Sequence, residues 1–554
     1  MGTGSSEHER YDLWWKTAVF YCLDVESYLD SVGDGIGDLH GLLERVDYLA
    51  ALGVTCIWLM PFYPTPNRDD GYDVTDYYGV DPRLGDLGDF TQFVDAARER
   101  GMRVIVDLVI NHTSIEHPWF QAARTGPDSP YHDYYVWQDE RPEDWETALV
   151  FPGEQTENWT YDRKARRYYL HHFYSHQPDL NPSDQRVHEE MKQIMSFWVQ
   201  LGVSGFRVDA VPFLIKMKGI ETQREILPHE FLRDLAAHLG RRRGDAIMLG
   251  EVNLPPHEAL EYFGDGNELE MLFNFNINQY LYLALARRHA DPLRKALEAL
   301  PAIPAGGQWA QFIKNHDELT LDQLTEAERQ EVFDAFGPDP DMQLFDRGIR
   351  RRLPPMLGGD TARIRLAYSV LFSLPGAPVL FYGEELGMGE NLDIPGRLAV
   401  RSPMQWTDED GAGFSAAPAD QLHRPVTTGA FGPGNVNAAA QIRDPHSMLS
   451  WMKDLIDRHR DVPEFGMGAH SVVDVGVPEV LASRSEWRDG VVLTLHNFSE
   501  QAVEVAIEAE LAGRRPVEIW SDRDYGESSP DGIKVEGSGY RWFRLVAPGE
   551  RFLA

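Results

Sequence analysis

The feature that most constrains the fold is a series of short, uniformly apolar segments separated by amphipathic helical stretches. Eight such segments are expected to be strands, at residues 18–24, 56–62, 103–112, 205–211, 246–252, 272–276, 309–316 and 378–385. Strands that are apolar throughout are typical of parallel sheets covered by helices on both faces. Eight of them alternating with helices predict an α/β fold, a closed (β/α)8 TIM barrel, rather than an open sheet. No glycine-rich dinucleotide motif follows any of these strands, which also disfavours the open sheet.

Two further regions depart from this alternation. Residues 113–184, between the third strand and the next helix, form a long insert rich in tryptophan and tyrosine. A loop of this length in a compact barrel is normally functional, and its position after a strand predicts a lid subdomain over the active-site face. After residue 464 short alternating strands predict a C-terminal antiparallel β-sandwich domain, residues 465–554. The barrel is then expected at residues 1–112 and 185–464.

The composition excludes several classes of partner. A formal net charge of −36 over 554 residues leaves no basic surface of the kind that nucleic acids or anionic membranes attract. No run of about 18 apolar residues occurs, and the N-terminal segment lacks an apolar signal region, so we expect a cytoplasmic protein without a membrane anchor. The two cysteines, Cys22 and Cys56, lie in apolar strands and are expected to be buried free thiols. The oligomeric state stays open, a homo-oligomer included.

Chemically reactive side chains gather at the ends of four expected strands. They are Asp107, Asn111 and His112; Arg207 and Asp209; Glu251; and His316 and Asp317. The C-terminal ends of barrel strands meet at one mouth, and carboxylates that meet there repel one another, so solubility does not explain them. Retaining glycoside cleavage needs this set: one carboxylate attacks the anomeric carbon and a second carboxylic acid protonates the leaving oxygen. A neighbouring arginine keeps the first carboxylate ionised, and histidines bind sugar hydroxyls.

Four segments, DLVINH, GFRVDAV, GEVN and KNHDE, follow one another on these strands. They resemble the four ordered motifs of the α-amylase family, glycoside hydrolase family 13, and the resemblance covers nearly the whole chain. It implies that Asp209 is the nucleophile, that Glu251 is the general acid/base, and that Asp317 stabilises the transition state by binding ring hydroxyls.

The resemblance also implies the residues that surround the sugar. Arg207 is expected beside the nucleophile, and His112 and His316 are expected to contact the sugar that undergoes cleavage. RDDGYDV, with Asp69 and Tyr72, is similar to a family segment that closes the non-reducing end of the pocket.

Two other motifs resemble the oligo-1,6-glucosidase branch of the family. They are QPDLN at 177–181 and RSPMQW, which supplies Arg401 near the same end of the pocket. A pocket closed in this way implies short α-glucosides, such as maltose, trehalose or sucrose, as substrates. An amylase that cuts inside polysaccharides would instead need an open cleft.

Within that branch, ENWTYD, KNHDELTLDQLT, GIRRRLPPML and PGAPVLFYGEELGMG look like segments of trehalose synthases. This likeness implies that maltose is isomerised to trehalose while the pocket excludes water. LGEVNLPP and LFNFNINQY differ from those enzymes near the expected acceptor site. Hydrolysis of a short α-glucoside, or transfer to another acceptor, is therefore the alternative. A barrel that has lost catalysis is disfavoured because all three carboxylates are present.

The segment DSVGDGIGD at 30–38 places oxygen ligands at alternating positions, as calcium loops do. Relatives hold Ca²⁺ in the matching loop, which implies a site at Asp30, Asp34, Ile36 and Asp38, although Val32 offers no side-chain ligand. The alternative is a glycine-rich turn in which Asp38 caps the following helix. No organic cofactor is expected.

Overall fold

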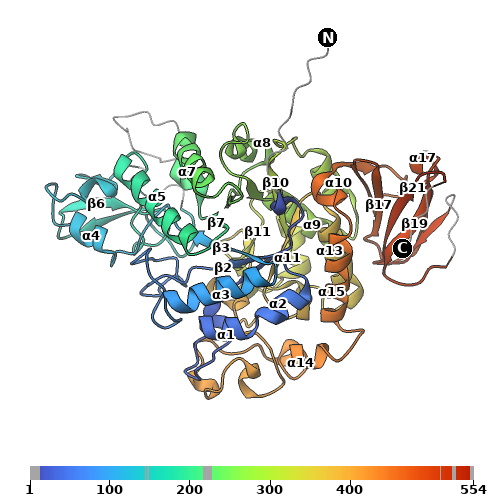
Figure 1. Cartoon of the computed structure of the whole chain (residues 1–554), viewed down its shortest axis with the longest axis horizontal. Helices are drawn as coiled ribbons and strands as arrows, with labels where there is room; N and C mark the ends of the chain where they lie inside the picture. The colour runs from blue at the N-terminus through green and yellow to red at the C-terminus, as the bar shows by residue number, and fades with distance from the viewer. Residues whose placement is uncertain are drawn as a thin grey trace, which may run out of the picture.

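The computed structural model describes residues 13–143, 145, 149–215, 228–511, 513–526 and 532–549. Eight parallel strands close a barrel in the order β1-β14-β10-β9-β8-β7-β3-β2 (Figure 1). They are β1 Phe20–Leu23, β2 Cys56–Leu59, β3 Arg103–Leu108, β7 Gly205–Val208, β8 Ile247–Gly250, β9 Met271–Phe273, β10 Gln308–Phe312 and β14 Ala377–Phe381. Each strand overlaps one of the expected segments, and almost every strand residue is buried. The predicted (β/α)8 barrel is therefore confirmed.

Helices surround the barrel (Figure 1). The longer ones are α1 Leu39–Glu44, α2 Val46–Leu52, α3 Leu87–Glu99, α5 Gln185–Gln200, α7 Pro228–Arg242, α9 Phe275–Arg287, α10 Asp291–Glu298, α11 Glu326–Phe336, α13 Thr361–Ser373 and α15 Met448–Arg460. Helix α5 shows why they form where they do. The Asp184 side chain accepts a hydrogen bond from the Arg186 N–H and caps the helix, and Met191, Ile194 and Trp198 bury one face against the barrel.

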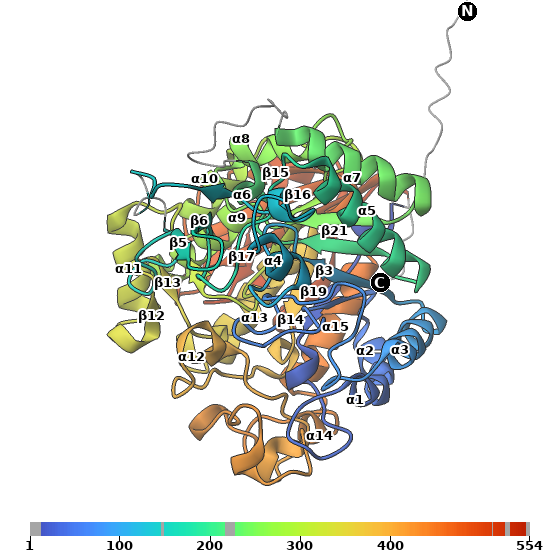
Figure 2. The same cartoon turned by 90° about the vertical axis from the view of Figure 1, so that its left-hand side faces the viewer.

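The insert after β3 folds as a small subdomain beside the barrel. Helix α4 Pro118–Ala123 accompanies a three-stranded sheet in the order β4-β6-β5, with β4 Trp137–Gln138, β5 Trp159–Asp162 and β6 Arg167–Leu170. It lies at the left of Figure 1 and faces the viewer in Figure 2. Val136, Trp159 and Leu170 form its small core, whereas Phe120, Tyr135, Trp137 and Tyr169 belong to the main core that the insert shares with the barrel.

The C-terminal region, in red at the right of Figure 1, is antiparallel. Its larger sheet has the order β15-β16-β17-β21-β19 and its smaller sheet pairs β18 with β20. The strands are β15 Ala469–Val473, β16 Val480–Trp487, β17 Gly490–Asn497, β18 Val503–Val505, β19 Arg515–Ser521, β20 Ile533–Val535 and β21 Tyr540–Val546. One apolar core, which includes Leu493 from the larger sheet and Ile533 from the smaller, joins the two sheets.

Two segments at the barrel mouth have a secondary structure that the sequence did not predict. One is a three-stranded sheet after β10, in the order β11-β13-β12, with β11 Leu319–Thr320, β12 Gln343–Leu344 and β13 Gly348–Ile349. The other is the irregular chain between β14 and α15, which holds only short helices. Strands of two residues are too short to show periodicity, so the sequence could not reveal them.

Two expectations about the whole chain have structural counterparts. Cys22 and Cys56 are buried free thiols, as predicted. Among the helices of the described residues, none combines the length and the apolar character needed to cross a membrane.

Candidate active site

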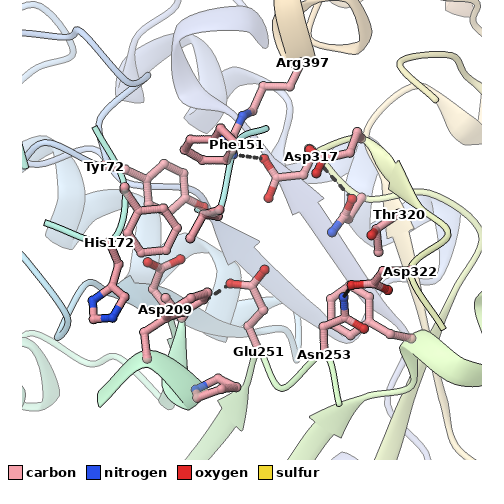
Figure 3. Close-up of a pocket in the computed structure, with 18 of the residues that line it drawn as sticks. Tyr72, Phe151, His172, Asp209, Glu251, Asn253, Asp317, Thr320, Asp322 and Arg397 are labelled. Atoms are coloured by element: carbon pink, nitrogen blue, oxygen red, sulfur yellow. Dashed lines mark hydrogen bonds and ion pairs between the residues drawn. The ribbon is translucent and has the colours of Figure 1, made fainter. Parts of the chain in front are cut away.

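A cavity of about 380 Å³ lies at the carboxyl ends of the barrel strands (Figure 3). This volume is at the small end of the range for ligand sites, roughly 300–1,000 Å³. Its wall includes Asp69, Tyr72, His112, His172, Asp209, Glu251, Asn253, Asp317, Glu318, Thr320, Asp322, Arg347 and Arg397, together with an apolar group formed by Leu149, Val150, Phe151, Phe173, Phe213 and Phe275. The three carboxylates expected to be catalytic thus face one cavity.

The Arg207 side chain joins the acids at the bottom of this cavity. Its Nη1 donates to Asp107 at 2.6 Å and to Asp209 at 2.5 Å, and its Nη2 donates to Glu251 at 2.5 Å. These acids lie at the ends of β3, β7 and β8, so the barrel itself brings them together. Because one guanidinium group spans Asp209 and Glu251, the two carboxylates lie close, as in retaining glycosidases, where about 5–5.5 Å separates them.

Burial raises the pKa of both of these acids. It raises the pKa of Asp209 to about 6, although Arg207 favours the charged form. Burial likewise raises the pKa of Glu251 to about 7, with the charges of Asp209 and Asp317 adding to the effect. Near pH 7 Asp209 is therefore mostly ionised, as a nucleophile must be, while Glu251 is partly protonated, as a general acid must be.

Asp317 stays ionised for a different reason. It accepts hydrogen bonds from Arg397 Nη1 at 2.7 Å and from Arg401 Nη2 at 2.9 Å. Burial opposes its charge, but the two arginines outweigh burial and hold the pKa of Asp317 well below its usual range. A permanently charged acceptor at this place suits the binding of sugar hydroxyls.

The remaining expected sugar contacts form one connected group. The Tyr72 hydroxyl lies 2.8 Å from His316 Nε2, and the two rings stack at 5.6 Å. His112 Nε2 lies 3.2 Å from the Tyr72 carbonyl oxygen, and Asp69 accepts a hydrogen bond from Gln177, in the QPDLN motif, at 2.8 Å. Burial lowers the pKa of both histidines, so they act as neutral hydrogen-bonding groups near pH 7.

Three residues expected to surround the sugar, Arg207, His316 and Arg401, lie outside the cavity wall and are each 1% exposed, so a direct contact with the sugar stays a prediction for them. Arg401 lies behind Asp317, whereas Arg397, four residues earlier, lines the cavity. Figure 3 shows Arg397 above Phe151 and beside Asp317. The sequence alone did not single out Arg397, which lies in a short helical turn, Gly396–Val400, where no periodicity marks the side that faces the cavity.

Polar side chains absent from the sequence prediction line the side of the cavity next to Glu251. Asn253 donates to Asp322 at 2.9 Å and accepts from Gln323 at 2.8 Å. Gln279, on α9, donates to the other oxygen of Asp322 at 3.0 Å. This wall brings together residues of the segments LGEVNLPP and LFNFNINQY, which the sequence analysis expected near the acceptor site.

An apolar roof closes the opposite side of the cavity, and three distant segments contribute to it. Phe151 comes from the insert and Phe213 from α6 Val211–Ile215, and both line the cavity; Phe345, from the turn between β12 and β13, packs behind Phe151 without lining the cavity itself. The rings of Phe151 and Phe345 lie 4.8 Å apart. Arg347 Nη2 donates to the Val150 carbonyl at 2.8 Å and joins the insert to that turn. The insert therefore contributes to the cavity wall, and its action as a lid stays a prediction.

The expected calcium loop is held by its own hydrogen bonds. Asp30 accepts three backbone N–H groups of the loop, Asp34 accepts the Ile36 N–H, and Asp38 caps α1 by accepting the Gly41 N–H. Within the part of the chain that the structure describes, no three His, Cys, Asp or Glu side chains converge to hold a metal ion. As arranged, the oxygens of Asp30, Asp34 and Asp38 accept N–H groups of the loop and do not converge on one point. Asp38 matches the alternative prediction of a helix cap, and a calcium ion in this loop stays a prediction.

Comparison with known proteins adds a family and near relatives. A model of the α-amylase catalytic domain matches residues 25–334 and 350–464. The trehalose synthase of Pimelobacter sp. is 41% identical over 97% of this chain and 96% of its own, and the trehalose synthase/amylase TreS of Mycolicibacterium smegmatis is 39% identical over 97% and 93%. A solved structure of the trehalulose synthase MutB, an inactive double mutant bound to isomaltulose, superimposes with a TM-score of 0.79 at 26% identity, covering 97% of this chain and 100% of that one.

Proposed function

Because this chain belongs to the α-amylase family of glycoside hydrolases and transglucosidases, we propose that it isomerises maltose to trehalose through a covalent glucosyl-enzyme intermediate. The observation that carries the proposal is the pair of Asp209 and Glu251, bridged by Arg207, in a small cavity under an apolar roof. The pair supplies retaining chemistry and the roof limits access of water.

In the first step, an oxygen of Asp209 attacks C1 of the non-reducing glucose of maltose. The bond between C1 and the glycosidic oxygen breaks, and Glu251 gives its proton to that oxygen. Free glucose is released, and a glucosyl ester on Asp209 remains. Arg207 stabilises the carboxylate that Glu251 becomes, since its Nη2 lies 2.5 Å from Glu251.

In the second step, the released glucose turns within the cavity and presents its anomeric hydroxyl. Glu251 removes the proton of that hydroxyl, whose oxygen attacks C1 of the glucosyl ester. The ester bond breaks, Asp209 regains its charge, and an α,α-linked disaccharide results. Asn253 and Asp322, on the wall next to Glu251, are placed to hydrogen-bond the turning glucose.

The donor end of the cavity supports a substrate with one glucose unit at that end. We assign Asp69, Tyr72, His112 and Arg397 to the grip on this unit, because all four line the cavity. Asp317 is assigned to its ring hydroxyls, held in place by Arg397 and Arg401. No step in this reaction is assigned to a cation at the Asp30–Asp38 loop.

Hydrolysis of short α-glucosides is the second candidate. It needs only water in place of glucose in the second step, and the M. smegmatis relative is named both a trehalose synthase and an amylase. The fate of the glucosyl ester therefore separates the two candidates.

Product analysis tests the proposal. The purified protein is incubated with maltose, and separately with sucrose, and the sugars are separated by chromatography. Trehalose with little free glucose from maltose is the expected result. Glucose as the main product would overturn isomerisation in favour of hydrolysis, and Asp209→Asn, which should give neither product, controls for contaminating enzymes.

A further inference from the structure

The Arg401 guanidinium is held on three sides. Its Nη2 donates to Asp317 at 2.9 Å, its Nε donates to the His316 carbonyl at 2.8 Å, and its Nη1 donates to the Asp70 carboxylate. Two of these acceptors belong to the loop after β10, which carries Asp317 itself. Asp70 belongs to the loop after β2 and is an anchor from a separate part of the barrel. Together the three acceptors fix the direction from which Arg401 meets Asp317.

Asp69 and Asp70 are neighbours in sequence, but their side chains lie on opposite sides of the cavity wall. Asp69 lines the cavity, whereas the Asp70 side chain, 4% exposed, binds arginines behind it. The backbone allows this divergence because Asp70 adopts a φ of +52° and Gly71 a φ of +92°. A left-handed conformation is strained for a residue with a side chain and persists only where its surroundings enforce it. The strained position carries a carboxylate that two buried arginines share.

Those arginines are Arg401 and Arg424, which both bind Asp70. Arg424 also donates to the Arg401 carbonyl at 3.2 Å and to Asp24, just after β1, at 3.1 Å. Burial opposes the charge on Asp70, but the two arginines outweigh it and hold the pKa of Asp70 well below its usual range. Asp70 is thus the anion between two buried guanidinium groups, and a buried charge that loses its partner is strongly unfavourable.

We infer that Asp70 is a positioning residue for glycosyl transfer: it anchors Arg401, and Arg401 in turn fixes the orientation of Asp317 toward the sugar. The inference rests on the proposed role of Asp317. Asp317 is expected to hold the ring hydroxyls most strongly in the transition state, and a misplaced group of that kind lowers kcat more than it weakens substrate binding.

Asp70→Asn tests the inference directly. Asparagine has the size of aspartate and tolerates a left-handed backbone, but it removes the charge that Arg401 and Arg424 share. The assay is cleavage of p-nitrophenyl α-glucoside, which requires glycosyl chemistry but not isomerisation, so its outcome is independent of whether maltose gives trehalose. We expect kcat to fall about 10–100-fold while KM changes by less than about threefold.

Glu464→Gln is the matched control. The Glu464 side chain is 3% exposed and binds Arg544 at 2.5 Å, beside the C-terminal sheet and away from the cavity. This variant also loses a buried ion pair, so its melting temperature should fall while kcat stays at the wild-type value. A folded Asp70→Asn variant with wild-type kcat would overturn the inference.

A double-mutant cycle shows whether Asp70 acts through Arg401. If it does, Asp70→Asn/Arg401→Gln should be no slower than Arg401→Gln alone; losses that multiply would contradict the inference. Should Asp70→Asn fail to fold, Asp70→Asn/Arg424→Gln removes one cation together with the anion, and the kcat loss should persist in it. Full activity in Asp317→Asn would overturn the proposed role of Asp317, and with it the inference that Asp70 acts by positioning Asp317.

Discussion

The floor and the roof of the cavity are built on different principles. The floor consists of charged groups at strand ends, joined by buried ion pairs around Arg207 and Asp317. The roof is apolar and comes from three segments that lie far apart in the sequence, with Phe151, Phe213 and Phe345 as its main parts. We infer that the two parts have different roles. The charged groups of the floor break and form the glycosidic bond, and the apolar roof controls whether water or glucose reacts with the glucosyl-enzyme intermediate.

Removal of the nucleophile should have the largest effect on the floor. Asp209→Asn leaves the volume of the side chain unchanged but removes the charge that attacks C1. We expect kcat on maltose to fall about 10⁴-fold or more, the size seen when a covalent nucleophile is lost. Circular dichroism should show an unchanged fold. Retention of more than a tenth of the wild-type rate would show that another group forms the intermediate.

The role of Glu251 as general acid leads to two predictions, a lower kcat when it is replaced and a characteristic pH profile in the wild-type protein. Glu251→Gln should lower kcat on maltose about 10²–10⁴-fold, and much less on an aryl glucoside whose leaving group needs no proton.

In the wild-type protein, kcat/KM should fall below a pH of about 6 as Asp209 is protonated and above a pH of about 7 as Glu251 loses its proton. The profile of Glu251→Gln should lack the alkaline decline. An alkaline decline that survives this substitution would assign it to another group.

A substitution in the roof should change the products rather than the rate. Phe345→Ala opens the contact between Phe345 and Phe151, whose rings lie 4.8 Å apart. Water should then compete with glucose, and the ratio of free glucose to trehalose should rise several-fold, while total maltose consumption changes by less than about threefold.

Phe333→Ala, on α11, is the control for the roof, because it removes an equally buried ring that belongs neither to the cavity wall nor to the apolar cluster of Phe151 and Phe345. Its product ratio should match that of the wild type. If both variants raise the ratio of glucose to trehalose equally, the effect comes from loss of stability. The proposal that the roof controls access of water would then be wrong.

The smallest expected effect concerns metal removal from the loop after β1. The Asp30–Asp38 loop lies against His423, whose backbone N–H donates to the Gly35 carbonyl, and the loop closes through its own N–H groups. We therefore expect a chelator to shift the melting temperature by less than about 1 °C, which corresponds to roughly 1 kcal/mol for a chain of this length. A larger drop that Ca²⁺ reverses would restore the calcium site that the resemblance implied.

Much of the floor could be predicted from the sequence, and little of the roof. Asp209, Glu251 and His112 stand at fixed offsets from apolar strands, and parallel strands of a barrel must end at one mouth. Phe345 lies in a short turn between two-residue strands, where no periodicity signals a structure. Nothing in its sequence neighbourhood shows that it meets Phe151, almost two hundred positions earlier.

The sequence by itself determined the barrel, the order of the reactive residues and the retaining chemistry they permit, because apolar periodicity and local spacing encode strand ends. Tertiary structure alone decided that Arg397 rather than Arg401 faces the cavity, that Asp69 and Asp70 point to opposite sides of its wall, and that an apolar roof covers it. It also decided the protonation of Asp209 and Glu251. Burial and charge pairing set these properties, and both depend on residues that only folding brings together.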